Sequence, residues 1–256
     1  MTCIVTVVTL AAVAIVGSCF ADDYDAGLPI AALVLARGGS KGIPLKNIVE
    51  IGPNQTLLGR TLDTIQKSDV FASVWVSTDH EQIAAEATRH GATVFARSAT
   101  HAQDHSTSLE ATREFLEAHP EIENFALVQC TSPFLRPHYL VEAVSRILLN
   151  VEFQIDYKPP CAFSVVRSYK LRWRMNPSSL RLEAINFDPT ARPRRQDWPG
   201  ELVETGMFYF TNRQLIMEMN SFQSDRCAIV EVEELDALEI DDTKDLALAR
   251  LLVELE

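Results

Sequence analysis

A block of fifteen residues near the amino-terminal end, Leu33–Asn47, has the composition and spacing of a phosphate-binding loop. Its three glycines can adopt positive φ angles and let the backbone approach a ligand, and the amide groups of such a loop form a nest for anions. Arg37, Lys41 and Lys46 add fixed positive charge. The spacing matches neither G-x-x-x-x-G-K-[ST] nor G-x-G-x-x-G, which disfavours a P-loop NTPase and a dinucleotide oxidoreductase. The alternative is a solvated glycine-rich turn.

A pair of acidic side chains far along the chain could hold a divalent cation. Glu239 and Asp241 are two positions apart and share one face if the backbone is extended. Such hard oxygen ligands favour Mg²⁺, which proteins usually hold with one or two carboxylates and the phosphates of a substrate. A solvated strand edge is the competing interpretation of this pair.

The elements that must position these residues alternate between strand and helix from Ile30 onward. Strands are expected at Ile30–Ala36, Ser73–Ser77, Thr93–Ala96, Phe125–Gln129, Ala162–Val166, Met207–Thr211 and Ala228–Glu231. Helices are expected at Leu57–Lys67, Glu81–His90, Ser108–Ala118, Pro137–Asn150, Arg213–Met219 and Thr243–Leu255. This alternation predicts an α/β fold with a mainly parallel sheet and helices on both faces. Ligands of such sheets bind at the carboxyl ends of the strands.

Several loops that follow the expected strands carry polar side chains. Ser77–Asp79 ends the second strand, where a helix N-cap is the favoured interpretation. Arg97 ends the third strand, and Asp104 and Ser106 precede the next helix, which they could cap if they do not read a base edge. Gln129 ends the fourth strand and is followed by two hydroxyl side chains. These loops are therefore expected to surround one crevice.

Residues 167–205 interrupt the alternation with prolines and arginines, which predicts an inserted β-hairpin arm or a dimerisation element. The net charge of −12 argues against nucleic-acid binding. Between Lys158 and Gln196, however, nine basic residues stand against two acidic ones. A basic insertion suits an anionic substrate or an acidic neighbouring subunit.

The amino terminus has the pattern of a targeting segment. The stretch Ile4–Phe20 is uncharged and mostly apolar, and small residues precede a cleavage point after Ala21. Residues 1–21 are therefore expected to be a signal peptide or an uncleaved signal anchor, which would be the chain's one membrane contact. In the secretory pathway the sequon at Asn54 becomes a candidate for N-glycosylation.

Three cysteines lie beyond this segment. Cys130, Cys161 and Cys227 are odd in number and lack metal-ligand spacing. We expect all three to be buried free thiols.

The blocks L-A-R-G-G-S-K-G-I-P-L-K-N at 35–47, Q-x-T-S-P at 129–133 and R-P-R-R-Q-D-W at 192–198 resemble the N-acylneuraminate cytidylyltransferases, or CMP-sialic acid synthetases. The resemblance runs from Ala31 to the carboxyl terminus. It implies transfer of CMP from CTP to the anomeric 2-hydroxyl of a sialic acid, with release of pyrophosphate and assistance by Mg²⁺. It also implies a three-layer, Rossmann-like nucleotidyltransferase fold over residues 28–256. Residues 167–205 would form a small inserted arm for dimerisation and the sugar site, in a homodimer or a dimer of dimers.

The resemblance also assigns roles to individual residues. The nucleotide-binding set would be Ala36, Arg37, Gly38, Ser40, Lys41, Lys46 and Asn47, with Arg97, Asp104 and Ser106 beside the cytosine. The sugar-binding set would be Gln129, Arg195, Gln196 and Tyr209. The catalytic set would be Arg37, Lys41, Lys46 and Asp241, with Asp241 and Glu239 as metal ligands.

Two positions depart from the family's pattern. The family's metal motif has aspartate where this chain has Glu239, and the Glu-Asn-Gly of relatives reads Glu204-Thr205-Gly206, which is expected to remove an amide near the sugar pocket. The leader favours work in the secretory pathway, in the Golgi, for the sialylation of glycoproteins and glycolipids. The alternatives are CTP-dependent activation of a related keto-sugar acid and a catalytically weak homologue that binds sugar or nucleotide.

Overall fold

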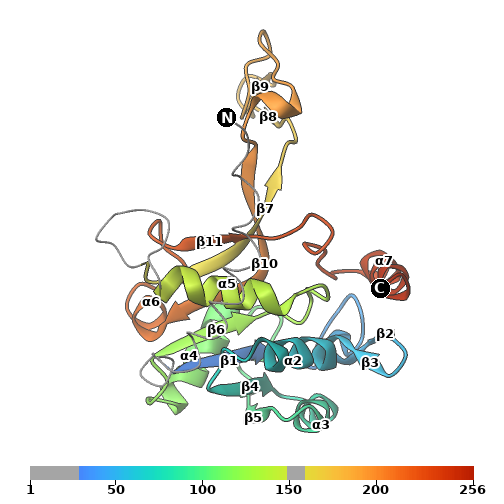
Figure 1. The fold of residues 1–256 in the computed structure, drawn as a ribbon, viewed down its shortest axis with the longest axis vertical. Helices are drawn as coiled ribbons and strands as arrows, with labels where there is room; N and C mark the ends of the chain where they lie inside the picture. Colours follow the sequence, from blue (N-terminus) through green and yellow to red (C-terminus); the bar gives the residue numbers. More distant parts are fainter. Residues whose placement is uncertain (1–28, 149–158) are drawn as a thin grey trace, which may run out of the picture.

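A computed structural model describes residues 29–148 and 159–256 and has a seven-stranded sheet at its centre (Figure 1). The strand order is β11-β7-β10-β6-β1-β4-β5. The strands are β1 (Ile30–Leu35), β4 (Ser73–Thr78), β5 (Thr93–Ala96), β6 (Asn124–Val128), β7 (Ala162–Ser168), β10 (Glu201–Asn212) and β11 (Ala228–Glu231). In this sheet β10 runs antiparallel to both of its neighbours, and the other pairings are parallel. The expectation of a mainly parallel sheet is therefore confirmed.

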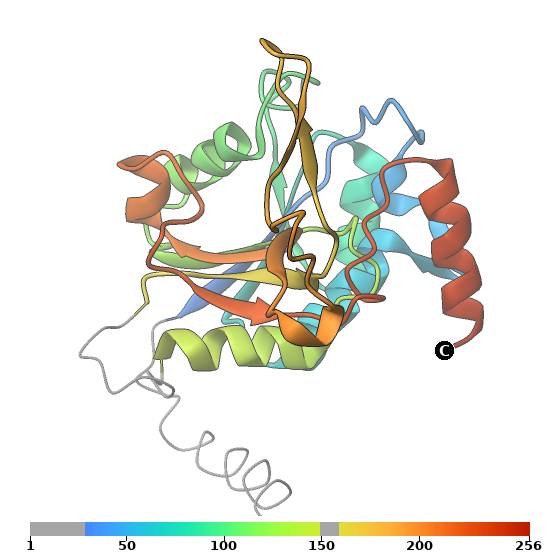
Figure 2. The ribbon, with the colours of Figure 1, turned by 90° about the horizontal axis from the view of Figure 1, so that it is seen from above.

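Helices cover both faces of the sheet, as Figure 2 shows for α5 on one side and α4 and α6 on the other. The helices are α2 (Leu57–Ser68), α3 (Glu81–Arg89), α4 (Ser108–Ala118), α5 (Pro137–Leu148), α6 (Arg213–Met217) and α7 (Thr243–Glu254). Local signals begin several of them. The side chain of Thr56 caps α2, and capping boxes begin α4 and α7. Within the described residues, no helix combines the length and the apolar character that crossing a membrane requires.

Strand β1 is apolar throughout because both of its faces are buried. Ala32 and Val34 pack into the cluster formed with α2, α3 and α5, while Leu33 packs against Phe115 of α4 and Ile216 of α6. Burial of a side chain such as Leu33 contributes about 1.5–3 kcal/mol to stability. The strand is thus held from both sides, and the loop that follows it begins at a well-anchored point.

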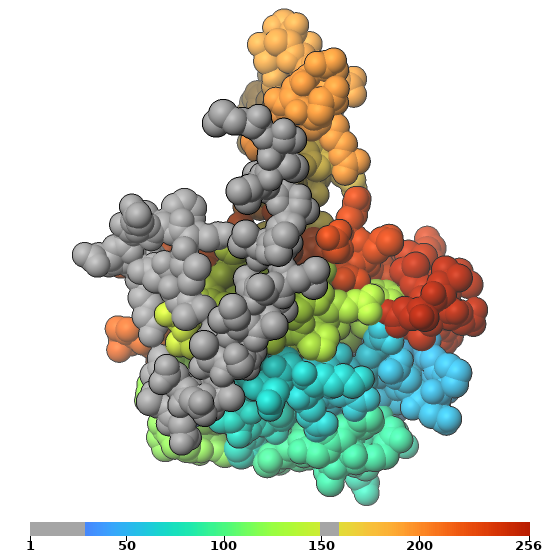
Figure 3. Space-filling model, viewed as in Figure 1, coloured from blue at the N-terminus to red at the C-terminus, as the bar shows by residue number. Residues whose placement is uncertain are grey.

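An arm stands away from the body of the molecule (Figures 1 and 3). It consists of the upper parts of β7 and β10, the hairpin of β8 (Trp173–Met175) and β9 (Leu182–Ala184), and the short helix η3 (Arg195–Asp197). Trp173, Met175 and Leu182 are exposed on it although they are apolar. The arm occupies the region where the sequence predicted an insertion.

The prediction of three free thiols is right for Cys130, which is buried and free, and wrong for Cys161 and Cys227, which form a disulfide. The reason lies in the sheet. Parallel pairing sets Ala162 opposite Ala228, so the cysteines that precede them lie side by side. The spacing of 66 residues carries no sign of that pairing. The predicted leader at residues 1–21 lies outside the described residues.

Replacing both Cys161 and Cys227 with serine is expected to lower the free energy of unfolding by about 2–4 kcal/mol, because the disulfide closes a long loop in the unfolded chain. Urea unfolding of the oxidised proteins measures this loss. A reducing agent should destabilise the wild type by a similar amount and leave the double variant unchanged. If the reducing agent left the urea midpoint of the wild type unchanged, that result would contradict the disulfide.

Candidate active site

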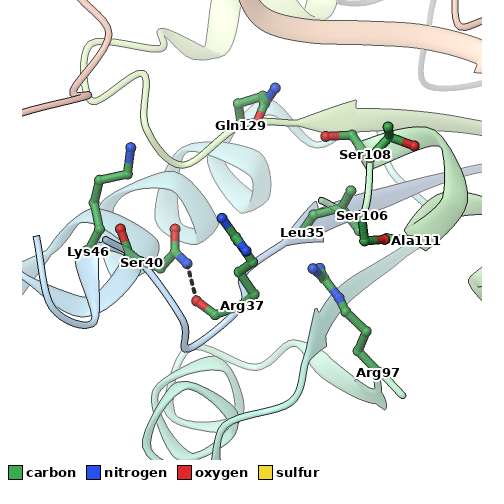
Figure 4. A pocket seen from close by; sticks show the side chains of 11 residues that line it. Leu35, Arg37, Ser40, Lys46, Arg97, Ser106, Ser108, Ala111 and Gln129 are labelled. Atoms are coloured by element: carbon green, nitrogen blue, oxygen red, sulfur yellow. Dashed lines mark hydrogen bonds between the residues drawn. The ribbon is translucent and has the colours of Figure 1, made fainter. Parts of the chain in front are cut away.

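A polar pocket of about 200 Å³ opens at the carboxyl ends of β1, β5 and β6. Figure 4 shows the side chains of Arg37, Arg97 and Lys46 entering it from different elements. The lining residues are Leu35, Arg37, Ser40, Lys46, Asn47, Arg97, Ser106, Thr107, Ser108, Ala111 and Gln129. The structure thus brings most of the predicted nucleotide-binding set, together with Gln129, to one cavity. Apart from Leu35 and Ala111, its walls are cations, hydroxyls and amides, which suits an anionic, hydrogen-bonding ligand.

The glycine-rich loop is held down by the end of the neighbouring strand β4. The amide of Gly38 donates to Asp79 Oδ1 at 2.8 Å. A Cβ atom on Gly38 would lie 2.7 Å from Cδ2 of His80, so any larger residue would have to displace the His80 side chain. The segment Ser77–Asp79 was expected to cap the next helix, but His80 is the residue whose side chain caps α3. Asp79, which follows β4, therefore anchors the glycine-rich loop, and the sequence pattern of a helix cap did not indicate this role.

Asn47 stabilises the same loop through its side-chain amide. Its Nδ2 donates to the carbonyl oxygen of Arg37 at 2.9 Å, and its Oδ1 accepts the Cys130 thiol at 3.1 Å. Burial raises the pKa of the Cys130 thiol to about 12, so the thiol keeps the proton that it donates. Since both groups of the Asn47 amide are engaged with the protein, this residue positions the loop in addition to lining the pocket.

Two cations of the loop are paired with one carboxylate. Arg37 and Lys41 each approach Asp104 to 2.7 Å. The hydrogen bond from Lys41, and then the one from Arg37, lowers the pKa of Asp104. A second cavity lies between Gly39–Lys41 and residues 102–104. The loop that carries Asp104 therefore lies against the glycine-rich loop, and its carboxylate partly neutralises the two cations there.

Arg97 is a buried cation at the pocket, with 8% of its surface exposed. Its guanidinium donates from Nε to Ser77 Oγ at 3.0 Å and from Nη2 to the carbonyl oxygen of Ser77 at 2.8 Å. Burial lowers the pKa of Arg97 to about 10, which still leaves the group charged at neutral pH. A fixed, partly desolvated cation of this kind interacts strongly with phosphate or with a base edge. Ser77 therefore supports Arg97, a role that its place in the expected cap did not indicate.

Lys46 connects the glycine-rich loop to the acid pair. Its Nζ donates to the carbonyl oxygen of Ile240 at 2.7 Å and lies 3.4 Å from Asp241 Oδ1. Thr131 Oγ1 donates to Glu239 Oε1 at 3.2 Å. Burial and the negative charge of Asp241 raise the pKa of Glu239. The acid pair thus lies beside the glycine-rich loop although about 200 residues of sequence separate them.

The donor set of this pair fits Mg²⁺. Glu239 and Asp241 are close enough for the charge of one to raise the pKa of the other, and a bound cation would relieve that repulsion. No group of three or more His, Cys, Asp or Glu side chains within residues 29–148 and 159–256 could hold a metal ion. A site with two carboxylates agrees with a Mg²⁺ ion that takes its other ligands from substrate phosphates and water.

The predicted sugar-binding residues divide between the body and the arm. Tyr209 donates its hydroxyl hydrogen to Glu204, and a Cβ atom on Gly206 would lie 3.9 Å from the Tyr209 hydroxyl and 3.7 Å from Glu239 Oε2. Tyr209 is thus close to the acid pair. Arg195 lies in η3 of the arm with its guanidinium 4.7 Å from the centre of the Tyr169 ring, and Gln196 lies next to it in η3. Neither arm residue lines the pocket.

Known proteins resemble this chain over most of its length. A family model described as "Cytidylyltransferase" matches residues 31–255. N-acylneuraminate cytidylyltransferase A of Danio rerio is 46% identical over 189 residues, which cover 73% of this chain and 42% of the relative. The N-acylneuraminate cytidylyltransferase of Escherichia coli is 30% identical over 220 residues, covering 86% of this chain and 51% of the relative. The chain therefore spans about half the length of these relatives or less.

Solved structures share the fold at low sequence identity. A CMP:2-keto-3-deoxy-manno-octonic acid synthetase complexed with CTP superposes with a TM-score of 0.63 at 15% identity, over 89% of this chain and 99% of that one. A 4-diphosphocytidyl-2C-methyl-D-erythritol synthase from Anaerococcus prevotii gives 0.62 at 15% identity, with coverages of 89% and 99%. These likenesses confirm the Rossmann-like nucleotidyltransferase fold.

Proposed function

This chain belongs to the cytidylyltransferase family, and we propose that it transfers CMP from CTP to the anomeric 2-hydroxyl of a sialic acid, giving CMP-sialic acid and pyrophosphate. The observation that carries the proposal is the contact of Lys46 with Ile240 and Asp241. It joins a phosphate-binding loop to a pair of carboxylates in one site. The names of the relatives, which are N-acylneuraminate cytidylyltransferases, support the choice of a sialic acid as the acceptor.

The reaction needs positioning and charge stabilisation more than covalent participation by the protein. The 2-hydroxyl oxygen of the sugar attacks the α-phosphorus in line and gives up its proton to water. A new O–P bond forms, and the bond from the α-phosphorus to the bridging oxygen breaks. Pyrophosphate leaves with the electron pair. Arg37 and Lys41 would bind the triphosphate, and Lys46 would neutralise charge that develops on the leaving group. Arg97 and Ser106 would border the cytosine.

We propose that Mg²⁺ takes part, held by Asp241 and Glu239 together with the phosphates of CTP. When bound, it would withdraw negative charge from the phosphoryl oxygens. The side chain of Asp241 is largely exposed beside Lys46, while Thr131 orients Glu239. Glu239 has one more methylene group than the aspartate of the family motif, and the hydrogen bond from Thr131 restrains this longer side chain.

Pyrophosphate release tests the proposal. Purified chain is incubated with CTP, N-acetylneuraminate and Mg²⁺, and both products are identified. We expect release that requires both substrates and that stops when EDTA is added. Competition with a related keto-sugar acid distinguishes the alternative acceptor. Binding of CTP without turnover, with turnover appearing in Glu239→Asp, would instead indicate a catalytically weak binding homologue.

We further propose a homodimer, alone or paired into a dimer of dimers, in which the arm completes the sugar site of the partner. The exposed apolar side chains Trp173, Met175 and Leu182 support this proposal, because apolar groups gathered on a projecting hairpin favour contact with another surface. Arg195 and Gln196 stand on the same arm, outside the pocket of their own chain. A cation from the partner's arm would meet the carboxylate of a sialic acid.

Finally, we propose that the chain works in the secretory pathway, in the Golgi, after entry through residues 1–21. The disulfide between Cys161 and Cys227 supports this compartment, because disulfides persist in oxidising environments. Asn54 is exposed between β2 (Glu50–Gly52) and β3 (Gln55–Thr56), where a glycan could be accommodated. Protection of the chain from protease in sealed microsomes, read together with its mature size, tests this placement.

A further inference from the structure

A bulge in β10 lies next to the acid pair. The register of β10 on β7 shifts between Glu204 and Tyr209, and Gly206 within the shift has a φ of +71°. A bulge of this kind leaves backbone groups without their regular ladder partners. Here the amides are satisfied by hydroxyl side chains. Phe208 donates its N–H to Ser164 Oγ at 3.2 Å, and Met207 donates its N–H to Thr205 Oγ1 at 3.4 Å.

The two hydroxyls that accept these amides also bond to each other. Thr205 Oγ1 donates to Ser164 Oγ at 2.8 Å, which links β10 to β7 across the bulge. Thr205 is 9% exposed and Ser164 is 1% exposed. The side chain of Thr205, at a position expected beside the sugar pocket, is therefore buried between the two strands. Its hydroxyl is part of a closed hydrogen-bond group that defines the shape of the bulge.

The shape of the β10 bulge determines which groups lie beside Glu239. Gly206 lies near both groups, because a Cβ atom built on it would be 3.7 Å from Glu239 Oε2 and 3.9 Å from the Tyr209 hydroxyl. Its φ of +71° is the conformation that favours glycine at this point. On the far side of the bulge, Glu204 turns back to accept the Tyr209 hydroxyl and the Gln223 side-chain amide. A change in the bulge would shift Glu204 and Tyr209 together relative to Glu239.

We propose that Thr205 and Ser164 are positioning residues for the acceptor sugar, whose hydroxyl pair holds the β10 bulge that sets Tyr209 and Glu204 beside Glu239. The inference rests on the proposed function and on the sugar-binding role that the family resemblance implies for Tyr209. A change in the bulge should affect the sugar and not CTP, because the bulge lies on the β7–β10 side of the site. The glycine-rich loop and Arg97 follow β1 and β5 on the other side of β6.

The experiment compares Thr205→Val, which keeps the shape and removes the hydroxyl, with Thr205→Ser, which keeps the hydroxyl. We expect Thr205→Val to raise KM for the sugar by about ten- to a hundredfold, since small misplacements of positioning groups have effects of this size, and to leave KM for CTP unchanged. Thr205→Ser should stay close to the wild type. The matched control is Thr211→Val in the same strand. Thr211 is also buried, and its hydroxyl has no hydrogen-bond partner within the described residues. Neither KM should change in that variant.

Hydrogen exchange of the Met207 and Phe208 amides, followed by mass spectrometry, reports on the bulge without any substrate. Faster exchange is expected in Thr205→Val and not in Thr211→Val. An unchanged sugar KM, or an equal rise in both KM values, would overturn the positioning role. If the wild type shows no turnover, the proposed function fails on its own. The affinity for sialic acid, measured by calorimetry, then replaces KM in the same comparison. Equal affinities of the wild type and Thr205→Val, or no binding by the wild type, would overturn this inference as well.

Discussion

Replacing Lys46 with alanine is expected to lower kcat for CMP transfer by about 10²–10³-fold, the loss typical of removing one preorganised group that stabilises developing charge. Lys46 belongs to the glycine-rich loop and reaches the acid pair. Its Nζ lies 2.7 Å from the carbonyl oxygen of Ile240 and 3.4 Å from Asp241 Oδ1. Its side chain is 16% exposed, so water screens its charge poorly. Steady-state rates of pyrophosphate release at saturating substrates measure the effect.

Two controls separate catalysis from folding in this prediction. Lys67→Ala removes an exposed lysine at the end of α2 and should leave kcat unchanged. The loss of the hydrogen bond from Lys46 to Ile240 should lower the stability of Lys46→Ala by only about 1 kcal/mol, so its thermal midpoint should stay near that of the wild type. A folded Lys46→Ala protein that keeps kcat within a few-fold of the wild type would contradict the role of this lysine.

Mixing two inactive variants, Lys46→Ala and Arg195→Ala, is expected to restore activity if the arm serves the partner's site. Lys46 belongs to the body and Arg195 to the arm. In a mixed dimer, one body has an intact Lys46 and receives an intact Arg195 from the other chain, while the second site lacks both. One of the two sites in each mixed dimer is intact, so mixed dimers isolated from the homodimers should have about half of the wild-type activity.

The control for this mixing experiment pairs two body variants, Lys46→Ala and Asp241→Ala. Each site of such a mixed dimer lacks one essential group, so no activity should return. The variants are co-expressed with different affinity tags, and the doubly tagged species is isolated before the assay. Mixed dimers of Lys46→Ala and Arg195→Ala that form without any recovery would contradict the shared site. A wild-type chain that sediments as a monomer would contradict the dimer itself.

Much of the fold follows from signals within a few residues of one another. The capping box of Thr107 with Glu110 begins α4, and that of Asp242 with Asp245 begins α7. The apolar run from Ile30 predicts a strand that is buried on both faces, and the glycines after it predict a loop that can approach an anion. The sequence could indicate these elements because helix caps, hydrophobic periodicity and glycine conformation are local properties.

The partners of the site residues could not be predicted in the same way. Arg97 and Gln129 were expected near a ligand because they follow strands, and the structure places both at one pocket. The role of Asp79 as the anchor of Gly38 was missed, because the same residue type at a strand end is equally typical of a helix cap. Strand β10 was expected to be shorter, and its insertion between β6 and β7 in the opposite direction carries no local signal.

Residue types at short spacing were enough to indicate the α/β class, the glycine-rich loop with its cations and the resemblance to cytidylyltransferases. Which distant residues meet depended on the folding of the whole chain. Lys46 and Ile240 are 194 positions apart, Cys161 and Cys227 are 66 apart, and Ser164 and Thr205 are 41 apart. Such contacts depend on strand order and register, which are set by how all the strands and helices bury their apolar faces together.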